Sequence, residues 1–595
     1  MYILGISCFY HESAAALIKD GEIVAASAEE RFSREKHDSE FPKLAAEFCL
    51  SKAGIQAQDL DFAVFYEKPF WKFHRILIST LATYPEALRL FPKAMVTWLS
   101  DKLWVRSIIA EELKIDPKKI LFVPHHVSHA ASAFYPSGFK NAAVMTMDGV
   151  GEWTTTTYGV GNDKNLEIFE EIKFPHSLGL LYSVFTAFLG FEVNDGEYKV
   201  MGMAPYGKPR YLNNVRKLVK IYSDGSYALK MEYFTFHKSV AQAYGKEFVG
   251  LFGKPREKDM HFFTKASGYP SYFGKKPENF EELCDLNQEY ADIAASIQAF
   301  TEEVILNIAR TVHKKTRLEN LCIAGGVGLN SVANGLLLRH GPFKRIFVQP
   351  AAGDDGGSLG AALYVYHQLL GKKRKFRQDH CYFGAEFKDA EILKFLKKKK
   401  IKYRKIENED KLTDFLASEI ANGKVIGFFH GRSEWGPRAL GARSIIADPR
   451  RDEMKEIVNT KIKFREPYRP FAPVTLAEKA SEYFELGGLE HQPLTNFMLG
   501  VFPVKKDKRK VIPAVTHVDG SGRLQIISSK QNARYYKLVK KFGQKTGVYV
   551  LMNTSFNLKG EPIVNSPENA FNTFKKSGLD ILALEKYIVL KEDLK

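Results

Sequence analysis

The sequence predicts an α/β protein with two domains, of which the first is internally duplicated. At 595 residues the chain is too long for a single hydrophobic core. A unit of strand, polar turn and strand occurs at the N-terminus and returns near residue 142. Farther along, short apolar runs typical of strands alternate with helical patterns. Two such halves predict a first domain with a nucleotide cleft between them.

The individual elements follow from apolar runs bounded by turn residues. In the first half, Asp20-Gly21 is a strong hairpin signal, and strands are predicted over residues 2–8, 13–19 and 22–28. In the second half, strands over 142–147 and 154–160 flank a polar turn. The elements predicted after these are a helix over 289–311, strands over 321–323 and 345–348, and a helix over 358–370.

The formal net charge of +17 raises the question of a nucleic-acid partner. Much of the excess lies in two lysine-rich runs, 372–375 and 397–400, and neither is interleaved with stacking aromatics. The second run is interpreted as a solvated helix face, and no nucleic-acid partner is expected. The first run begins a stretch that separates a predicted domain over 1–370 from one over 380–595.

Composition also bears on the compartment. The five cysteines are odd in number and widely spaced, and they form no CxxC pair, which favours a reducing, cytoplasmic setting. No run of about 18 uncharged apolar residues occurs, so no membrane span is expected. The aromatic and basic segment 71–104 is interrupted by prolines. It is predicted to form helices packed on the body, with contact to a membrane surface as the alternative.

Two histidines and two acidic turns predict a metal site. His125 and His129 are four residues apart in a helix-compatible stretch, so both imidazoles fall on one helix face. Asp148 follows a predicted strand, and Asp354 and Asp355 are expected in a second, exposed acidic turn. Two imidazoles with one or two carboxylates suit a catalytic divalent metal. The alternative is one surface histidine and one core histidine.

Glycine turns and arginines indicate anionic ligands. The Gly325-Gly326 turn ends a predicted strand, where a bare backbone can approach a nucleotide, although tight packing alone would explain it. The second domain carries arginines and lysines on loops rich in glycine and proline, where bidentate contacts to phosphate are favoured. These loops are 431–444, 461–470, 519–523 and 553–557.

Motifs spread over the whole chain reveal a family resemblance. They are His11-Glu-Ser-Ala-Ala, the His125/His129 pair, Met147-Asp148-Gly149, Lys199-Val-Met-Gly-Met-Ala-Pro-Tyr-Gly, Gly325-Gly326-Val, Gly353-Asp354-Asp355-Gly, Gly436-Pro437-Arg438-Ala439-Leu440-Gly and Asn553-Thr-Ser-Phe-Asn. In combination they resemble the O-carbamoyltransferases of antibiotic and nodulation-factor biosynthesis. The resemblance implies an N-terminal domain of the actin/sugar-kinase (ASKHA) type, close to the tRNA threonylcarbamoyl transferases, and a YrdC-like C-terminal domain.

The resemblance also implies a reaction and its cofactors. Carbamoyl phosphate and ATP, with Mg, would form carbamoyl-adenylate and pyrophosphate, and the carbamoyl group would pass to an acceptor hydroxyl with release of AMP. The implied metal is iron(II), although zinc and manganese suit the same ligands. The acceptor would be a natural product or a glycan. A homodimer is the assembly that the family suggests.

Residue roles are carried over from the matching motif positions. His11 would be the general base. The metal ligands would be His125, His129, Asp148 and Asp354, with Asp355 in place of Asp354 as the alternative. The nucleotide-binding residues would be Gly149, Lys199, Gly325, Gly326 and Asn330. The residues that hold carbamoyl phosphate would be Arg438, Lys463, Arg469, Arg523 and Ser555.

Other functions remain open at this point. A sugar or carboxylate kinase would use the first domain but leave the arginine-rich domain without a role. A tRNA-modifying threonylcarbamoyl-type transferase would fit the metal site and the positive charge. A hydrogenase-maturation carbamoyltransferase would need paired-cysteine zinc motifs, which the sequence lacks. A non-catalytic binding protein is the least favoured of these.

Overall fold

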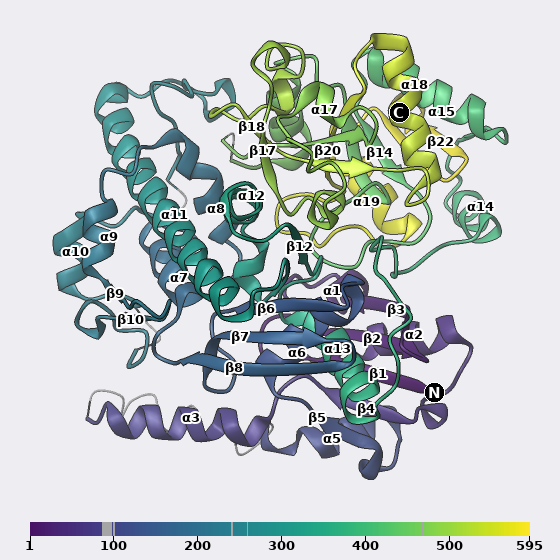
Figure 1. Ribbon diagram of the computed structural model, residues 1–595. Coiled ribbons are helices and arrows are strands. Elements are labelled where there is room, and N and C mark those ends of the chain that lie inside the picture. Colours follow the sequence, from purple (N-terminus) through teal and green to yellow (C-terminus); the bar gives the residue numbers. More distant parts are fainter. Residues whose placement is uncertain (86–97, 99–101, 240–241, 259, 467, 595) are drawn as a thin grey trace. The chain divides into compact units, whose positions relative to one another are not determined.

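The computed structural model describes residues 1–85, 98, 102–239, 242–258, 260–466 and 468–594, which fall into two compact units (Figure 1). The first unit comprises Met1–Glu29, Ser39–Tyr269 and Lys275–Gln378. The second unit comprises Glu30–Asp38, Pro270–Gly274 and Asp379–Lys595. The chain passes to the second unit after Gln378, just beyond the lysine-rich run 372–375. Two short excursions from the first part of the chain also belong to the second unit, which the sequence did not indicate.

The first unit contains two five-stranded sheets with the same strand order. The first sheet runs β3-β2-β1-β4-β5, and the second runs β8-β7-β6-β11-β12. In each sheet the central strand, β1 or β6, pairs antiparallel with the strand that follows it in sequence and parallel with a later one. The strands of the first sheet are β1 (Tyr2–Ser7), β2 (Ala14–Lys19), β3 (Glu22–Ala28), β4 (Phe62–Phe65) and β5 (Ile120–Phe122). Those of the second are β6 (Asn141–Met147), β7 (Thr154–Asn162), β8 (Asn165–Lys173), β11 (Asn320–Ala324) and β12 (Arg345–Val348). The predicted duplication is therefore confirmed.

The local signals explain several of these elements. The hairpin between β2 and β3 turns at Asp20 and Gly21, which both have positive φ, 51° and 85°, as a tight turn between twisted strands requires. The long helix α11 (Phe280–Thr316) is longer at both ends than predicted. Glutamates in its first turn and lysines in its last turn complement the helix dipole and extend it beyond the apolar pattern.

Two helices join the halves of the first unit. Helix α6 (His125–Phe134) follows β5 and packs on the second sheet, and helix α13 (Asp354–Tyr364) follows β12 and packs on the first sheet (Figure 1). The two helices also pack against each other. Gly360 makes this possible, because a Cβ there would lie 1.8 Å from the carbonyl oxygen of Ser128. The first turns of both helices consequently meet at one place.

The prediction of an exposed acidic turn at Asp354 and Asp355 is wrong. Asp354 and Asp355 form the first turn of α13, and their exposed fractions are only 1% and 8%. The predicted helix over 358–370 thus begins four residues earlier and ends in a π-helical turn over Val365–Leu369. Strand β12 leads into this helix within a few residues, so the carboxylates enter the interior instead of solvent.

The second unit is also α/β, as expected. Its eight-stranded mixed sheet runs β13-β22-β21-β14-β15-β20-β16-β19. Helix α18 (Ala533–Thr546) packs on β16 and β20, and α19 (Pro567–Lys576) packs on β14 and β21. The strands are β13 (Arg404–Lys405), β22 (Tyr587–Leu590), β21 (Ile581–Leu584), β14 (Ile426–Phe429), β15 (Arg443–Ala447), β20 (Val550–Ser555), β16 (Ala472–Leu476) and β19 (Gln525–Ile527).

The surface segments largely follow expectation. Lysines 397–400, at the end of α14 (Asp389–Lys398), are exposed, which confirms the solvated face. Of the segment 71–104, α3 (Pro69–Ala82) is helical as predicted, whereas 86–97 and 99–101 lie outside the described residues. None of the described helices combines the length and the apolar character that a membrane crossing needs.

Candidate functional site

The first two turns of α6 present two buried imidazoles to one point. His125 and His129 have exposed fractions of 1% and 0%, and their Nε2 atoms are 3.1 Å apart. This confirms the prediction that both lie on one helix face. It also removes the alternative of one surface and one core histidine.

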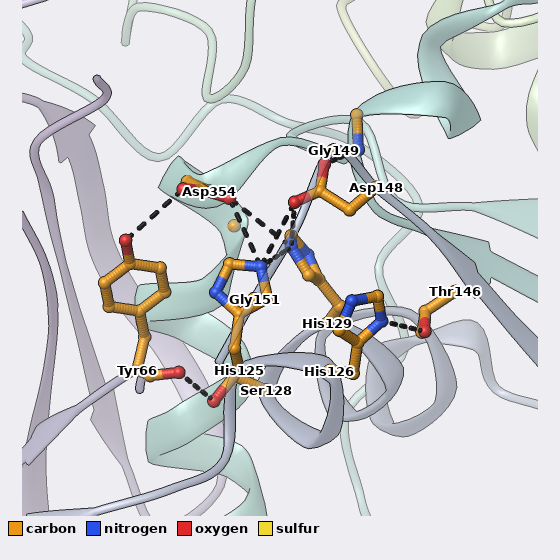
Figure 2. A network of polar contacts seen from close by, with 12 residues as sticks. Tyr66, His125, His126, Ser128, His129, Thr146, Asp148, Gly149, Gly151 and Asp354 are labelled. Atoms are coloured by element: carbon orange, nitrogen blue, oxygen red, sulfur yellow. Dashed lines mark hydrogen bonds and ion pairs between the residues drawn. The ribbon is translucent and has the colours of Figure 1, made fainter. Parts of the chain in front are cut away.

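Two carboxylates complete the cluster from other elements (Figure 2). Asp148 follows β6, and its Oδ2 lies 3.2 Å from Nε2 of His125 and 3.8 Å from Nε2 of His129. Asp354 begins α13, and its Oδ1 lies 3.6 Å and 3.5 Å from the same two nitrogens. Ligand atoms bound at about 2.1 Å to a common ion are separated by roughly 3.0–3.4 Å, so the four side chains need only small adjustments. We name this set the His/Asp cluster.

The cluster distinguishes Asp354 from Asp355. Oδ1 of Asp354 is buried and accepts no hydrogen bond within the described structure, while its Oδ2 accepts one from the Tyr66 hydroxyl at 3.3 Å. Oδ1 of Asp355 instead accepts from the backbone N–H of Gly356. A buried carboxylate oxygen without a donor, facing two imidazoles, fits a metal ligand.

The charges of the cluster also suit a divalent ion. Burial would raise the pKa of Asp148, but the hydrogen bond from His125 and the nearby His129 outweigh it and hold this pKa well below the usual value. Burial would lower the pKa of His129, but the nearby carboxylates of Asp148 and Asp354 raise it to about 10. A proton on His129 thus offsets part of the charge of the two buried carboxylates. A divalent cation held by neutral imidazoles would offset the charge of both carboxylates.

A shell of polar residues around the cluster was missed by the sequence reasoning. Glu152 accepts the backbone N–H of His125 at 3.0 Å and that of Lys68 at 2.8 Å. A buried ion pair of 2.7 Å joins Lys72 to Glu67, whose Oε2 lies 4.0 Å from Nδ1 of His125. Glu152 belongs to the turn after β6 and could have been selected. Glu67 and Lys72 lie in no motif and carried no signal.

The residues predicted to bind nucleotide divide into two groups. Gly326 donates its N–H to Oδ1 of Asp148 at 2.9 Å, and Gly325 has φ of 90° and lies against the Met147 backbone. Gly149 directly follows Asp148, so these three glycines adjoin the cluster. Asn330 instead caps helix α12 (Ser331–His340), its Oδ1 accepting the N–H of Ala333 at 3.1 Å.

The remaining two predicted residues of the first unit differ in their placement. Nζ of Lys199, in α8 (Glu197–Met203), lies over the Phe191 ring, 5.7 Å from its centre. His11, in the turn after β1, places Nε2 3.8 Å from Oδ2 of Asp354. A quarter of the His11 side chain is exposed, so this imidazole adjoins the His/Asp cluster and reaches solvent.

In the second unit, the predicted phosphate ligands gather as a cation cluster. Nζ of Lys463 is buried and donates to the Ser555 carbonyl at 2.7 Å and to Oδ1 of Asn557 at 2.6 Å. Burial, and then the neighbouring Arg465 and Arg469, hold the pKa of Lys463 well below its usual value.

Arg523 belongs to the same cluster. Burial lowers the pKa of Arg523, and Arg438, Arg465 and Arg469 lower it further. The cation cluster is therefore Arg438, Lys463, Arg465, Arg469 and Arg523, with Ser555 and Asn557 beside Lys463. Arg465 and Asn557 lay in the sequence motifs but were not selected. Cations that lower one another's pKa are typical of a site for an anion.

Comparison with known proteins gives a consistent result. A family model described as "Carbamoyltransferase N-terminus" matches residues 2–363, and one described as "Carbamoyltransferase C-terminus" matches 417–591. An uncharacterized protein of Synechocystis is 46% identical over 99% of this chain and 97% of its own length. Nodulation protein NolNO of Sinorhizobium fredii is 36% identical over 98% of this chain and 79% of its own.

Solved structures resemble the chain only weakly. HypF from T. kodakarensis is 16% identical, covering 62% of this chain and 48% of its own, with a TM-score of 0.29. The ROK hexokinase from Thermus thermophilus is 14% identical, covering 62% of this chain and 100% of its own, with a TM-score of 0.28. The actin/sugar-kinase character of the first unit follows instead from its repeated strand order.

Proposed function

Because the chain belongs to the carbamoyltransferase family, we propose that it is an ATP-dependent O-carbamoyltransferase. Carbamoyl phosphate and ATP would yield carbamoyl-adenylate and pyrophosphate, and the carbamoyl group would then pass to an acceptor hydroxyl with release of AMP. For the atoms to balance, water must first cleave carbamoyl phosphate to carbamate and inorganic phosphate. The carbamate oxygen must then attack the α-phosphorus of ATP and displace pyrophosphate. The observation that carries this proposal is the cation cluster, because a kinase would have no use for it.

The second unit would bind carbamoyl phosphate. Lys463 and Arg523 each lie near Arg465 and Arg469, which lower their pKa values, and a small dianion would relieve this repulsion. Arg438 and Arg469 would stabilise the charge that develops on the leaving phosphate. Ser555, hydrogen-bonded to Lys463, would orient the substrate.

The first unit would transfer the carbamoyl group. His125, His129, Asp148 and Asp354 would hold a divalent metal, with iron(II) proposed and zinc or manganese suited to the same donors. When bound, the ion would neutralise phosphate charge of the adenylate. Gly149, Gly325 and Gly326 would let the nucleotide approach the backbone, while Lys199 and Asn330 are proposed at its edge. His11 would accept the proton of the attacking hydroxyl.

The proposed setting is the cytoplasm, the proposed partners are ATP with Mg, carbamoyl phosphate and a hydroxyl acceptor, and the proposed assembly is a homodimer. The acceptor is a natural product or a glycan. Light scattering of the purified chain would test the assembly, with a monomer contradicting it.

The decisive experiment is to incubate the protein with carbamoyl phosphate, Mg-ATP and iron(II). We expect pyrophosphate and carbamoyl-adenylate to appear, and both to be lost in Arg469→Gln and Ser555→Ala. A matched control is Arg106→Gln, because Arg106 is an exposed arginine of the first unit. Formation of ADP without pyrophosphate would support a kinase and contradict the proposal. Full activity of both cluster variants would reject the phosphate site.

A further inference from the structure

The two excursions of the first part of the chain, Glu30–Asp38 and Pro270–Gly274, pack as parts of the second unit. The first excursion contains the short helix α1 (Glu30–Ser33) and two arginines, Arg31 and Arg34. The Arg31 guanidinium hydrogen-bonds to the carbonyl of Gly436, near Arg438, and that of Arg34 to carbonyls of the loop that follows Asn557. The first excursion therefore contacts two loops next to the cation cluster.

Arg31 holds the first of these loops. Its exposed fraction is 4%, and its Nη2 donates to the carbonyl of Gly436 at 2.9 Å. Gly436 lies two residues before Arg438. Its φ of 104° is a backbone conformation that residues other than glycine rarely adopt. Nη1 of Arg31 is buried without a hydrogen-bond partner among the described residues. A buried guanidinium is costly, which indicates that its contact with the loop is needed.

Arg34 contacts a second loop, at Pro562 and Ile563, through both terminal nitrogens of its guanidinium. Nη1 donates to the carbonyl of Ile563 at 2.7 Å, and Nη2 donates to that of Pro562 at 2.6 Å. The neighbouring residue Val564 donates its N–H to the carbonyl of Phe556 at 2.9 Å. Phe556 lies between Ser555 and Asn557, which accept hydrogen bonds from Nζ of Lys463. Arg34 is thus linked through the backbone to the Lys463 end of the cation cluster.

Tyr272 of the second excursion is affected by charged residues of the segment 456–466. Burial, and then the carboxylates of Glu456 and Glu466, raise the pKa of Tyr272, while Arg465 acts in the opposite direction. Glu466 in turn pairs with Arg469 at 3.3 Å. Of the two excursions, the first therefore provides the hydrogen bonds to loops of the second unit.

We infer that Arg31 and Arg34 are positioning residues of the anion site, which hold the loops that present Arg438 and Ser555. This inference rests on the proposed function and deepens it, because it makes the N-terminal part of the chain a structural component of carbamoyl-phosphate binding. Neither arginine belongs to the set of ligands assigned from the motifs. Their action is exerted through backbone carbonyls.

The test uses the full chain and inorganic phosphate as the probe. Calorimetric titration would compare the wild type with Arg31→Gln and Arg34→Gln. We expect each variant to bind phosphate about 10-fold more weakly, the usual effect of losing a hydrogen bond from a charged group. Amide hydrogen exchange over 436–444 and 556–564 should become faster at the same time. The matched control is Arg106→Gln, whose guanidinium also donates to two backbone carbonyls, those of Pro117 and Ile120 in the first unit.

The conservative variants separate positioning from charge. Arg34→Lys keeps the positive charge but cannot donate to two carbonyls in a fork, so we expect it to bind phosphate as weakly as Arg34→Gln. Arg31→Lys can keep its single hydrogen bond, so we expect it to restore much of the binding. Full binding by Arg34→Lys with weak binding by Arg34→Gln would mean that charge alone matters, and would overturn the inference.

The remaining outcomes are also distinct. Folded Arg31→Gln and Arg34→Gln proteins that bind phosphate like the wild type, with unchanged exchange in both loops, would overturn the inference and leave the proposed function intact. A wild-type chain that binds neither inorganic phosphate nor carbamoyl phosphate would overturn both. Unchanged metal content in all variants would show that the first unit is not disturbed.

Discussion

At the scale of single residues, the proposed chemistry depends on buried polar groups and on the polar atoms that surround them. Oδ1 of Asp354 lacks a hydrogen-bond donor but faces Nε2 of His125 and His129. Lys463 is buried among carbonyl and amide oxygens. Burying such charged groups costs free energy, which a bound ligand of opposite charge would offset. Substitutions of such residues should therefore affect ligand binding more than folding.

The first prediction concerns metal content. His125→Ala combined with His129→Ala removes both nitrogen donors, so we expect iron or zinc to fall from about one ion per chain to a background level. The measurement is elemental analysis of the purified proteins. His126→Gln is the matched control, because His126 lies between the two histidines but pairs with the Thr146 hydroxyl. Unchanged metal in the double variant would reject the ligand assignment.

The second prediction concerns pH and a histidine far from this chemistry. His367 is 2% exposed, and burial lowers its pKa from 6.5 to about 4. On acidification the unfolded chain therefore binds a proton before the folded chain does, and stability falls between pH 6.5 and 4. Between pH 7 and pH 5 this residue should reduce the free energy of unfolding by about 2 kcal/mol.

Denaturant unfolding at both pH values would test this effect. His367→Gln should lose about 2 kcal/mol less stability than the wild type on going from pH 7 to pH 5. His340→Gln, which replaces an exposed histidine, should follow the wild type. Equal pH dependence in all three proteins would contradict the assignment.

At the scale of elements, the site depends on the crossing of α6 and α13. Each helix begins with a predicted metal ligand, and each follows the last strand of one half. Since α6 packs on the second sheet and α13 on the first, the duplication brings equivalent helix ends together. The close approach at Gly360 sets their separation.

The third prediction tests this crossing. Gly360→Ala places a methyl group 1.8 Å from the Ser128 carbonyl oxygen, so the helices must separate. We expect a loss of roughly 1–3 kcal/mol of stability and weaker metal binding. The control is Gly250→Ala in α10 (Lys246–Phe252), where the added Cβ meets nothing within 4 Å. That change should stabilise the helix by up to about 1 kcal/mol. Similar melting temperatures for the two variants would argue against the close crossing.

At the scale of the whole molecule, the boundary in sequence and the boundary in structure differ. The lysine-rich stretch is fastened to the first unit by Arg374, which donates to the carbonyls of Phe134 and Phe139. The second unit begins only at Asp379, yet it also contains residues 30–38 and 270–274. The two units are thus not independent lengths of chain.

The fourth prediction follows from this interleaving. A fragment of residues 379–595 lacks both excursions, so the loops at Gly436 and Pro562 lose the arginines that hold them. We expect the fragment to unfold at a lower temperature than the full chain and to bind inorganic phosphate at least about 10-fold more weakly. Addition of a peptide of residues 30–38 should restore part of the binding. A fragment that unfolds at the same temperature as the full chain and binds inorganic phosphate as tightly would contradict the prediction.

The sequence by itself determined the features that depend on neighbouring residues. Helix periodicity was enough to place His125 and His129 on one face, and turn chemistry was enough to place the hairpin at Asp20 and Gly21. The repeated pattern of strand, turn and strand identified the duplication. These signals are local, since each relies on spacings of a few residues.

Features that depend on contacts between distant segments became visible only in the folded protein. The tertiary structure placed Asp354, and not Asp355, in the His/Asp cluster, and it moved both from an expected exposed turn into the interior. It assigned Asn330 to a helix cap and added Glu67, Glu152 and Arg31 to the surroundings of the two sites. The physical reason is that the burial of a side chain and its hydrogen-bond partners depend on packing between distant segments. The spacing of residues along the chain does not determine this packing.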